Sequence, residues 1–175
     1  MPGAEVLDLF AVPDVAVPLA DDDRGRVVCG DLLLSPGRDP EVLVWLNPLL
    51  ARLAVRLDER PGRAVRDLRI AMPVPARDGS WVVEGWAASR YEPGTAMCHD
   101  PAVELATAHL LHAELAVAVP TRPAPLPAAS EPGAQLVHAD LAGNVLLDAA
   151  GAPVVLDVEP AWRPARWAAE QLLSR

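Results

Sequence analysis

Residues 136–160, LVHADLAGNVLLDAAGAPVVLDVEP, restrict the possible folds of this chain more than any other segment. Two apolar runs flank the turn-forming stretch DAAGAP at 148–153, and this pattern predicts a β-hairpin. Polar residues stand immediately before and after the two strands: His138, Asp140, Asn144 and Asp157. A hairpin returns the chain on itself, so we expect Asp157 to lie beside Asn144.

These polar residues are of the types that phosphoryl transfer requires. A carboxylate must lie at the acceptor hydroxyl, and hard oxygen ligands must hold Mg²⁺ against the phosphates of ATP. We therefore expect Asp140 to act as the base and Asn144 and Asp157 to bind the metal. His138 is expected to brace the loop through hydrogen bonds to the backbone.

The whole chain limits the other possibilities. With 175 residues, of which 51% are hydrophobic, it has room for one ordinary domain or two small lobes. The net charge of −9 argues against nucleic acid and membrane surfaces as partners. Two cysteines make neither a disulfide framework nor a zinc site. The N-terminus lacks the pattern of a signal peptide and no apolar run is long enough to span a bilayer, so a cytoplasmic protein is expected.

The first half of the chain reads as β-rich with one helix. Residues 1–20 are expected to form a loosely attached arm or an edge strand, and 26–36 a hairpin. A helix is expected over 39–62, with Asp39 as N-cap and a bend or split at Pro48. A β-meander over 68–94 is expected to contain one long strand at 81–91.

The second half reads as two helices and the motif segment. A helix is predicted over 99–120 with Asp100 as N-cap, followed by a linker at 121–135 and, after the motif, a closing helix that starts near Pro164. The fold class is therefore α+β.

Several polar and aromatic residues have simpler interpretations. The acidic run Asp21, Asp22 and Asp23 is expected in a solvated turn. His109 and His112 are expected on a helix surface, and Cys98-His99-Asp100 in a loop that leads into a helix cap. We expect Trp81 and Trp86 on opposite faces of a strand and Trp162 and Trp167 against the closing helix. Arg163 is expected either at the metal site or on the surface.

The motif segment resembles the catalytic loop and metal-binding strand of the aminoglycoside/choline phosphotransferase superfamily. The usual pattern there is H-G-D-x-x-x-x-N, then an apolar strand that ends in Asp. This sequence has His138-Ala139-Asp140, then Asn144, then Val154-Val155-Leu156-Asp157. The segments ARDGSWVVEGWAASRYEPG and VLDVEPAWRPARWAAE are similar to an uncharacterised actinobacterial branch of that superfamily.

The resemblance implies a protein-kinase-like fold with a small β-rich N-lobe at 1–94 and a reduced C-lobe at 95–175. Nucleotide is then expected at the hinge, near Ser89, Arg90 and Tyr91. The acceptor site would take a small-molecule hydroxyl, with ATP and Mg²⁺ as the other requirements. The short C-lobe would be completed by a second copy or another partner, if it is completed at all.

Three departures from the family bear on activity: the turn LADDDRGRV replaces a small glycine-containing turn over the phosphates, the C-lobe is short, and a lysine is missing. All 15 basic residues are arginine, so the phosphate-binding lysine of the third N-lobe strand is replaced, by Leu33 or Leu34. Losing one such electrostatic donor commonly costs on the order of 10²–10³ in rate. Arg24 or Arg26 could substitute for it. Three hypotheses on function remain open: an impaired ATP-dependent small-molecule O-phosphotransferase, a pseudokinase that serves as a binding module, and a truncated remnant.

Overall fold

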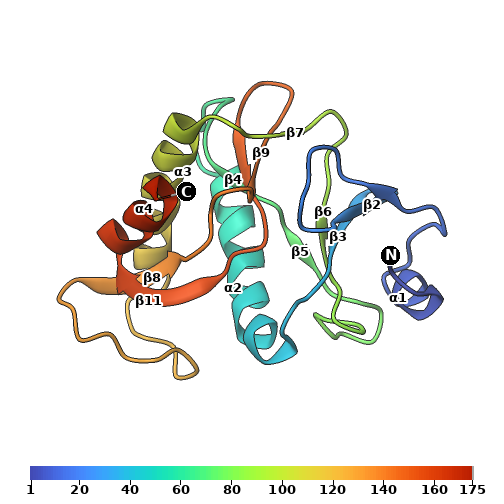
Figure 1. Cartoon of the computed structure of the whole chain (residues 1–175), viewed down its shortest axis with the longest axis horizontal. Coiled ribbons are helices and arrows are strands. Elements are labelled where there is room, and N and C mark those ends of the chain that lie inside the picture. Colours follow the sequence, from blue (N-terminus) through green and yellow to red (C-terminus); the bar gives the residue numbers. More distant parts are fainter. Residues whose placement is uncertain (175) are drawn as a thin grey trace. The chain divides into compact units, whose positions relative to one another are not determined.

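A computed structural model describes residues 1–174, which form two compact units (Figure 1). One unit comprises Met1–Arg63 and Ile70–Ala96, and the other comprises Ala64–Arg69 and the chain from Met97 onwards. The chain has an α+β architecture. The sequence predicts the boundary between its N-lobe and its C-lobe at 94/95.

The N-terminal unit is built on a five-stranded antiparallel sheet of order β1-β2-β3-β6-β5 (Figure 1). Its strands are β1 (Val17–Pro18), β2 (Val27–Cys29), β3 (Leu32–Ser35), β5 (Pro73–Val74) and β6 (Ala87–Arg90). The predicted hairpin at 26–36 is confirmed, because β2 and β3 pair around Gly30-Asp31.

The prediction of a loosely attached arm or an edge strand over residues 1–20 is wrong for the first ten residues. Ala4–Leu9 form the helix α1, and Val6, Leu7 and Phe10 are buried in the core with β2 and β3. The nearest prolines, Pro2 and Pro13, lie outside this segment, so no proline interrupts the short helix. The apolar side chains of this turn-and-a-half therefore cover the sheet instead of lying loosely on it.

The long helix of this unit is α2 (Pro40–Asp58). The Asp39 side chain accepts a hydrogen bond from the Glu41 N–H, which confirms the predicted cap. Pro48 lies inside the helix without splitting it. Leucines at helical spacing form its buried face: Leu43, Leu46, Leu50, Leu53 and Leu57.

The long strand predicted at 81–91 is interrupted by a tight turn. Val83 and Trp86 exchange both backbone hydrogen bonds around Glu84 and Gly85, whose φ angles are 47° and 79°. Positive φ at both central residues is the geometry of a two-residue hairpin turn. The strand β6 starts only at Ala87, so the expectation that Trp81 and Trp86 lie on opposite faces of one strand is wrong.

The second unit contains the motif segment. Here β8 (Ala134–His138) pairs with β11 (Pro160–Pro164), and β9 (Val145–Leu147) pairs with β10 (Pro153–Val155). The latter two are central in a four-stranded sheet of order β4-β10-β9-β7, and the chain passes between units within β4 (Arg69–Ile70) and β7 (Ala96–Met97).

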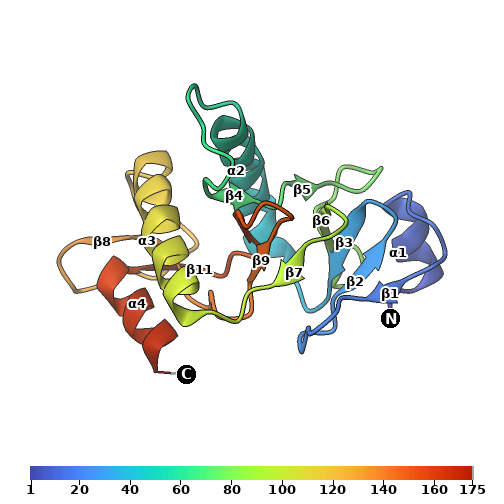
Figure 2. The same cartoon turned by 90° about the horizontal axis from the view of Figure 1, so that it is seen from above.

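Two helices pack against the β8–β11 ribbon: α3 (Pro101–Ala118) and α4 (Ala165–Leu173), which lie side by side (Figure 2). Asp100 caps α3 by accepting the Ala102 N–H, as predicted. The closing helix starts after Pro164, as expected, but the strand β11 before it was not predicted.

The buried face of α3 is partly polar. Leu110 is 53% exposed, whereas Glu104, Thr107 and His112 are buried. The helix therefore turns three polar side chains toward the interior of its unit.

Candidate functional site

His138 ends β8 and is buried, with 1% of its surface exposed. Its Nδ1 accepts the backbone N–H groups of Asp140, at 3.2 Å, and Glu159, at 3.4 Å. An accepting Nδ1 carries no proton, so the neutral ring has its proton on Nε2. The ring thus ties the start of the motif loop to the segment that follows Asp157, which are the contacts that the predicted bracing role requires.

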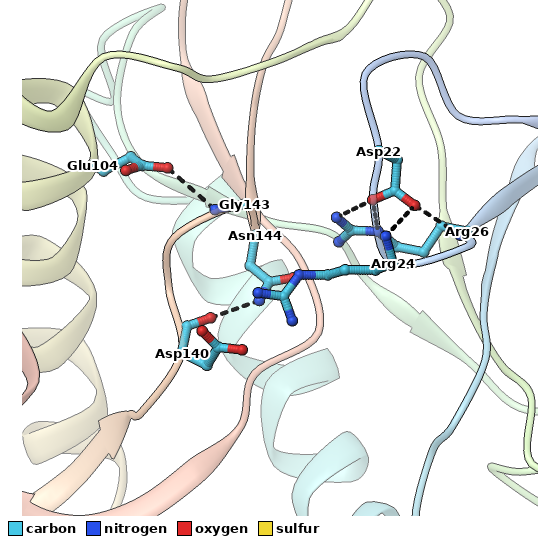
Figure 3. Close-up of polar contacts among 7 residues, drawn as sticks. All are labelled: Asp22, Arg24, Arg26, Glu104, Asp140, Gly143 and Asn144. Atoms are coloured by element: carbon cyan, nitrogen blue, oxygen red, sulfur yellow. Dashed lines mark hydrogen bonds and ion pairs between the residues drawn. The ribbon is translucent and has the colours of Figure 1, made fainter. Parts of the chain in front are cut away.

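A tight turn carries the chain from Asp140 to Asn144. The Asn144 N–H donates to the Leu141 carbonyl at 2.8 Å, and Gly143 in between has φ of 70°. A turn with positive φ at its third residue favours glycine there. Asn144 is buried, and its Nδ2 donates to the Asp140 carbonyl oxygen at 2.6 Å (Figure 3). This bond fixes which end of the amide faces Asp140 and directs Oδ1 elsewhere.

The hairpin register places Asp157 beside this turn. Val155 pairs with Val145, and the next N–H, from Leu156, donates to the Asn144 carbonyl at 2.8 Å. Asp157 follows directly, with φ of 39°. A non-glycine residue in this region costs on the order of 1–3 kcal/mol, and such residues cluster at functional sites. The structure therefore brings Asp157 and Asn144 together through the backbone.

The donor chemistry of this trio suits a hard cation. Asn144 offers an amide oxygen, Asp157 a carboxylate, and Asp140 a second carboxylate four residues before Asn144, and oxygen donors of these kinds are the ones Mg²⁺ prefers. Over residues 1–174, no group of three or more His, Cys, Asp or Glu is arranged to hold a metal ion. The predicted site has a different composition, because one of its ligands is an amide.

Two side chains of α3 contact the motif segment and were missed by the sequence interpretation. Glu104 Oε1 accepts the Gly143 N–H at 3.3 Å, and His112 Nε2 accepts the His138 N–H at 3.1 Å. The placement of His112 on a helix surface is wrong, because it is 2% exposed. Burial, together with the charge of His109, lowers the pKa of His112 to about 4.

A sequence signal for both residues did exist. The buried positions of α3 are 104, 107, 108, 111, 112 and 115, which follow the helical period. Glu104 and His112 fall on that period together with the leucines. Polar residues at core-facing positions need partners, and the motif segment supplies them.

In the N-terminal unit, the two arginines proposed to bind phosphate differ in burial: Arg26 is buried, whereas Arg24 is partly exposed. Arg26 and Asp22 form an ion pair in which both side chains are 1% exposed, with Nε and Nη2 of Arg26 both on Asp22 Oδ1 (Figure 3). Asp22 Oδ2 also accepts the N–H groups of Arg24 and Arg26. The expected solvated turn is therefore wrong for Asp22, whose carboxylate organises the turn, whereas Asp21 and Asp23 are exposed.

The predicted hinge residues lie at the end of β6. The N–H of Arg90 donates to the Met72 carbonyl and that of Tyr91 to the Asp31 carbonyl, both at 2.9 Å. Ser89 pairs with Leu33 on one side and Pro73 on the other. Arg90 also forms an exposed ion pair with Asp31. Leu33 and Leu34, where the family lysine was expected, are both buried in the core.

The structure also places Arg163, the two cysteines and Asp100. Arg163 is exposed, contacts Glu131 at 3.4 Å and lies 5.6 Å above the Trp167 ring. Of its two expected positions, the metal site and the surface, these contacts favour the surface. Cys29 and Cys98 are buried free thiols, and burial raises the pKa of each. Asp100 caps α3, as the reading of Cys98-His99-Asp100 required.

Comparisons with known proteins gave no match, whether with protein-family models, curated proteins or solved structures. In the described part of the chain, no helix is both long and apolar enough to cross a membrane.

Proposed function

We propose that this chain is an aminoglycoside-phosphotransferase-like protein of reduced size, with a protein-kinase-like fold. Its second unit would carry the base and the metal ligands of an ATP-dependent small-molecule O-phosphotransferase of impaired activity. The observation that carries the proposal is the arrangement of Asp140, Asn144 and Asp157 on one braced loop and the adjoining strand ends. Sequence motif and local geometry support it together, without a detected relative.

Each residue has a role in this proposal. Asp140 would accept the proton of the acceptor hydroxyl as that oxygen attacks the terminal phosphorus. Asn144 and Asp157 would hold Mg²⁺, which when bound neutralises charge on the phosphates. His138 and the Leu141–Asn144 turn would keep Asp140 and Asn144 in place. Positioning of this kind supplies most of the catalysis in phosphoryl transfer, because the protein does little covalent chemistry there.

Two features favour impaired activity. Arg26, one of the two arginines proposed for phosphate, is buried and committed to Asp22, so Arg24 is the remaining proposal for that role. In addition, three residues separate Asp140 from Asn144, one fewer than in the family pattern given above. The tight Leu141–Asn144 turn accommodates the shorter loop.

The alternative is a pseudokinase that retains the fold as a binding module. The observation in its favour is the apolar pair Leu33 and Leu34 on β3, where the family carries its lysine. Such a protein would bind nucleotide without transferring phosphate.

The first test is calorimetric titration with ATP, with and without Mg²⁺, on the wild type and on Asp157→Asn. We expect Mg²⁺-dependent binding that weakens by at least about tenfold in the variant, equivalent to about 1.4 kcal/mol. A folded wild type that binds no ATP at millimolar concentration would refute the nucleotide-binding proposal in both its forms.

Turnover separates the two functions. Wild type and Asp140→Asn would be compared for phosphate transfer from ATP to a panel of amino- and hydroxyl-bearing small molecules. The enzyme reading expects product with wild type, a loss of at least about 10² in rate with Asp140→Asn, and similar MgATP affinity in both proteins. Binding without product from any acceptor would favour the pseudokinase.

A further inference from the structure

The buried face of α3 carries an unusual number of polar groups. Three of its six buried residues are Glu104, Thr107 and His112. A buried polar side chain is costly unless it is hydrogen-bonded, so each needs a partner. Thr107 finds its partner within the helix, because Oγ1 donates to the Val103 carbonyl at 2.7 Å. Glu104 and His112 instead reach out of the helix to the motif segment.

Glu104 holds the far end of the motif loop. Glu104 is only 8% exposed. Its Oε1 accepts the N–H of Gly143, the third residue of the turn that ends at Asn144 (Figure 3). A hydrogen bond from an N–H group to a carboxylate is stronger than one to a neutral acceptor. The carboxylate therefore restrains the residue next to Asn144.

His112 holds the near end of the loop. Its Nε2 accepts the backbone N–H of His138, and its own backbone carbonyl accepts Gln135 Nε2 at 2.9 Å. Glu104 and His112 are eight residues apart, which is about 12 Å along a helix. One rigid element thus anchors the chain on both sides of Asp140.

We propose that Glu104 and His112 are positioning residues, which hold the loop that carries Asp140 and Asn144 in its working geometry. This inference rests on the proposed function, since it assigns a role in that same site. Neither residue touches the reacting atoms. Glu104 acts through Gly143 on Asn144, and His112 acts through His138 on Asp140.

The variants separate positioning from stability. Glu104→Leu removes the acceptor, whereas Glu104→Gln retains an oxygen that can accept the Gly143 N–H. Thr107→Val is the matched control, because it removes a buried hydrogen bond on the same face of α3 that does not reach the loop. Should Glu104→Leu not fold, Glu104→Asp retains the charge and shortens the side chain by one methylene.

Two measurements would be made on each protein: amide hydrogen exchange over 138–144, and titration with ATP in the presence of Mg²⁺. For Glu104→Leu we expect exchange in the loop about tenfold faster and MgATP affinity about tenfold weaker. Glu104→Gln should restore both to within about threefold. Thr107→Val should lower global stability but leave the exchange rate of the loop and the MgATP affinity unchanged. His112→Gln, which also retains an acceptor, should resemble Glu104→Gln.

Failure of this inference is distinguishable from failure of the proposed function. If Glu104→Leu leaves loop exchange unchanged or matches Thr107→Val in both measurements, the positioning role is overturned, whatever the wild type binds. If the wild type binds no MgATP, the proposed function fails, and faster loop exchange in Glu104→Leu would still show that α3 orders the loop. Loss of affinity in Glu104→Gln equal to that in Glu104→Leu would also contradict the hydrogen-bond mechanism.

Discussion

At the scale of single residues, the main finding is that charged and polar side chains lie where apolar ones are usual. Asp22, Arg26, Glu104 and His112 are all buried, and each has partners within its own unit. Such groups contribute little when paired but cost much when one partner is removed. Their effects on stability can therefore be measured one residue at a time.

Asp22 gives the sharpest of these effects. Replacing Asp22 by Ala removes the carboxylate that binds the buried Arg26 guanidinium and the acceptor of two backbone N–H groups. We expect the free energy of unfolding to fall by about 3–5 kcal/mol, measured by chemical denaturation. Asp23→Ala, one position along and exposed, should change it by less than about 0.5 kcal/mol. Equal effects from both variants would contradict the structure of this turn.

His112 predicts a pH dependence of stability. Burial lowers its pKa in the folded protein to about 4, from 6.5 when unfolded, so the unfolded chain binds the proton more tightly. The stability is fully present above pH 6.5 and is lost as the pH falls toward 4, by up to about 3 kcal/mol. In His112→Gln this part of the pH dependence should disappear, as measured by denaturation at pH 7.0 and 4.5.

The control for this prediction is His99→Gln, because His99 is exposed in the loop before α3. This variant should retain the wild-type difference between the two pH values. A His112→Gln protein with the same difference as wild type would show that His112 does not titrate in this window.

At the scale of elements, turns and caps decide where helices and strands begin and end. Asp39 and Asp100 start α2 and α3, and Glu84-Gly85 interrupts what would otherwise be one long strand. Pro48, by contrast, does not end α2. Local chemistry that satisfies backbone groups therefore sets these boundaries, whereas α1 and α4 begin without a side-chain cap.

The Glu84-Gly85 turn can be tested in both directions. Gly85→Ala places a side chain at φ of 79° and should lower the free energy of unfolding by about 1 kcal/mol. Glu84→Asn should raise it by a few tenths of a kcal/mol, since Asn tolerates positive φ better than Glu. Thermal unfolding of both variants measures the effects, and stabilisation by Gly85→Ala would contradict the assigned turn.

At the scale of the whole molecule, the chain changes unit more than once. The segment Ala64–Arg69 belongs to the second unit, although the residues on either side of it belong to the first. Within the second unit, Arg66 Nε donates to the Ala150 carbonyl at 2.9 Å, and Arg69 approaches Asp148 at 3.7 Å. Both contacts meet the turn that joins β9 and β10.

These contacts predict that the crossing segment stabilises the β9–β10 hairpin. Arg66→Ala combined with Arg69→Ala should increase amide hydrogen exchange over 145–155 by about threefold to tenfold, corresponding to about 0.7–1.4 kcal/mol, while α1 and β2 are unaffected. Arg52→Ala, on α2 in the first unit, is the control and should leave the hairpin unchanged. Unchanged exchange in the double variant would show that the hairpin does not depend on the segment.

The amino-acid sequence by itself determined the elements whose signals are local. The Gly30-Asp31 hairpin, both capped helices, the closing helix and the α+β class follow from turn residues, caps and periodicity within a few residues of each other. The order of polar residues in 136–160, read with a hairpin, was also enough to expect Asp157 beside Asn144, which the register provides.

Only the tertiary structure decided the partners of buried polar groups and the fate of segments with weak local signals. Asp22 looks like one of three solvated aspartates until Arg26 is placed against it, and the partner of His112 is known only once β8 packs on α3. Ala4–Leu9 become helical because the apolar side chains of α1 pack in a core whose other residues come from later parts of the chain. In each case the deciding free energy comes from contacts distant in sequence or from burial, which a local pattern does not contain.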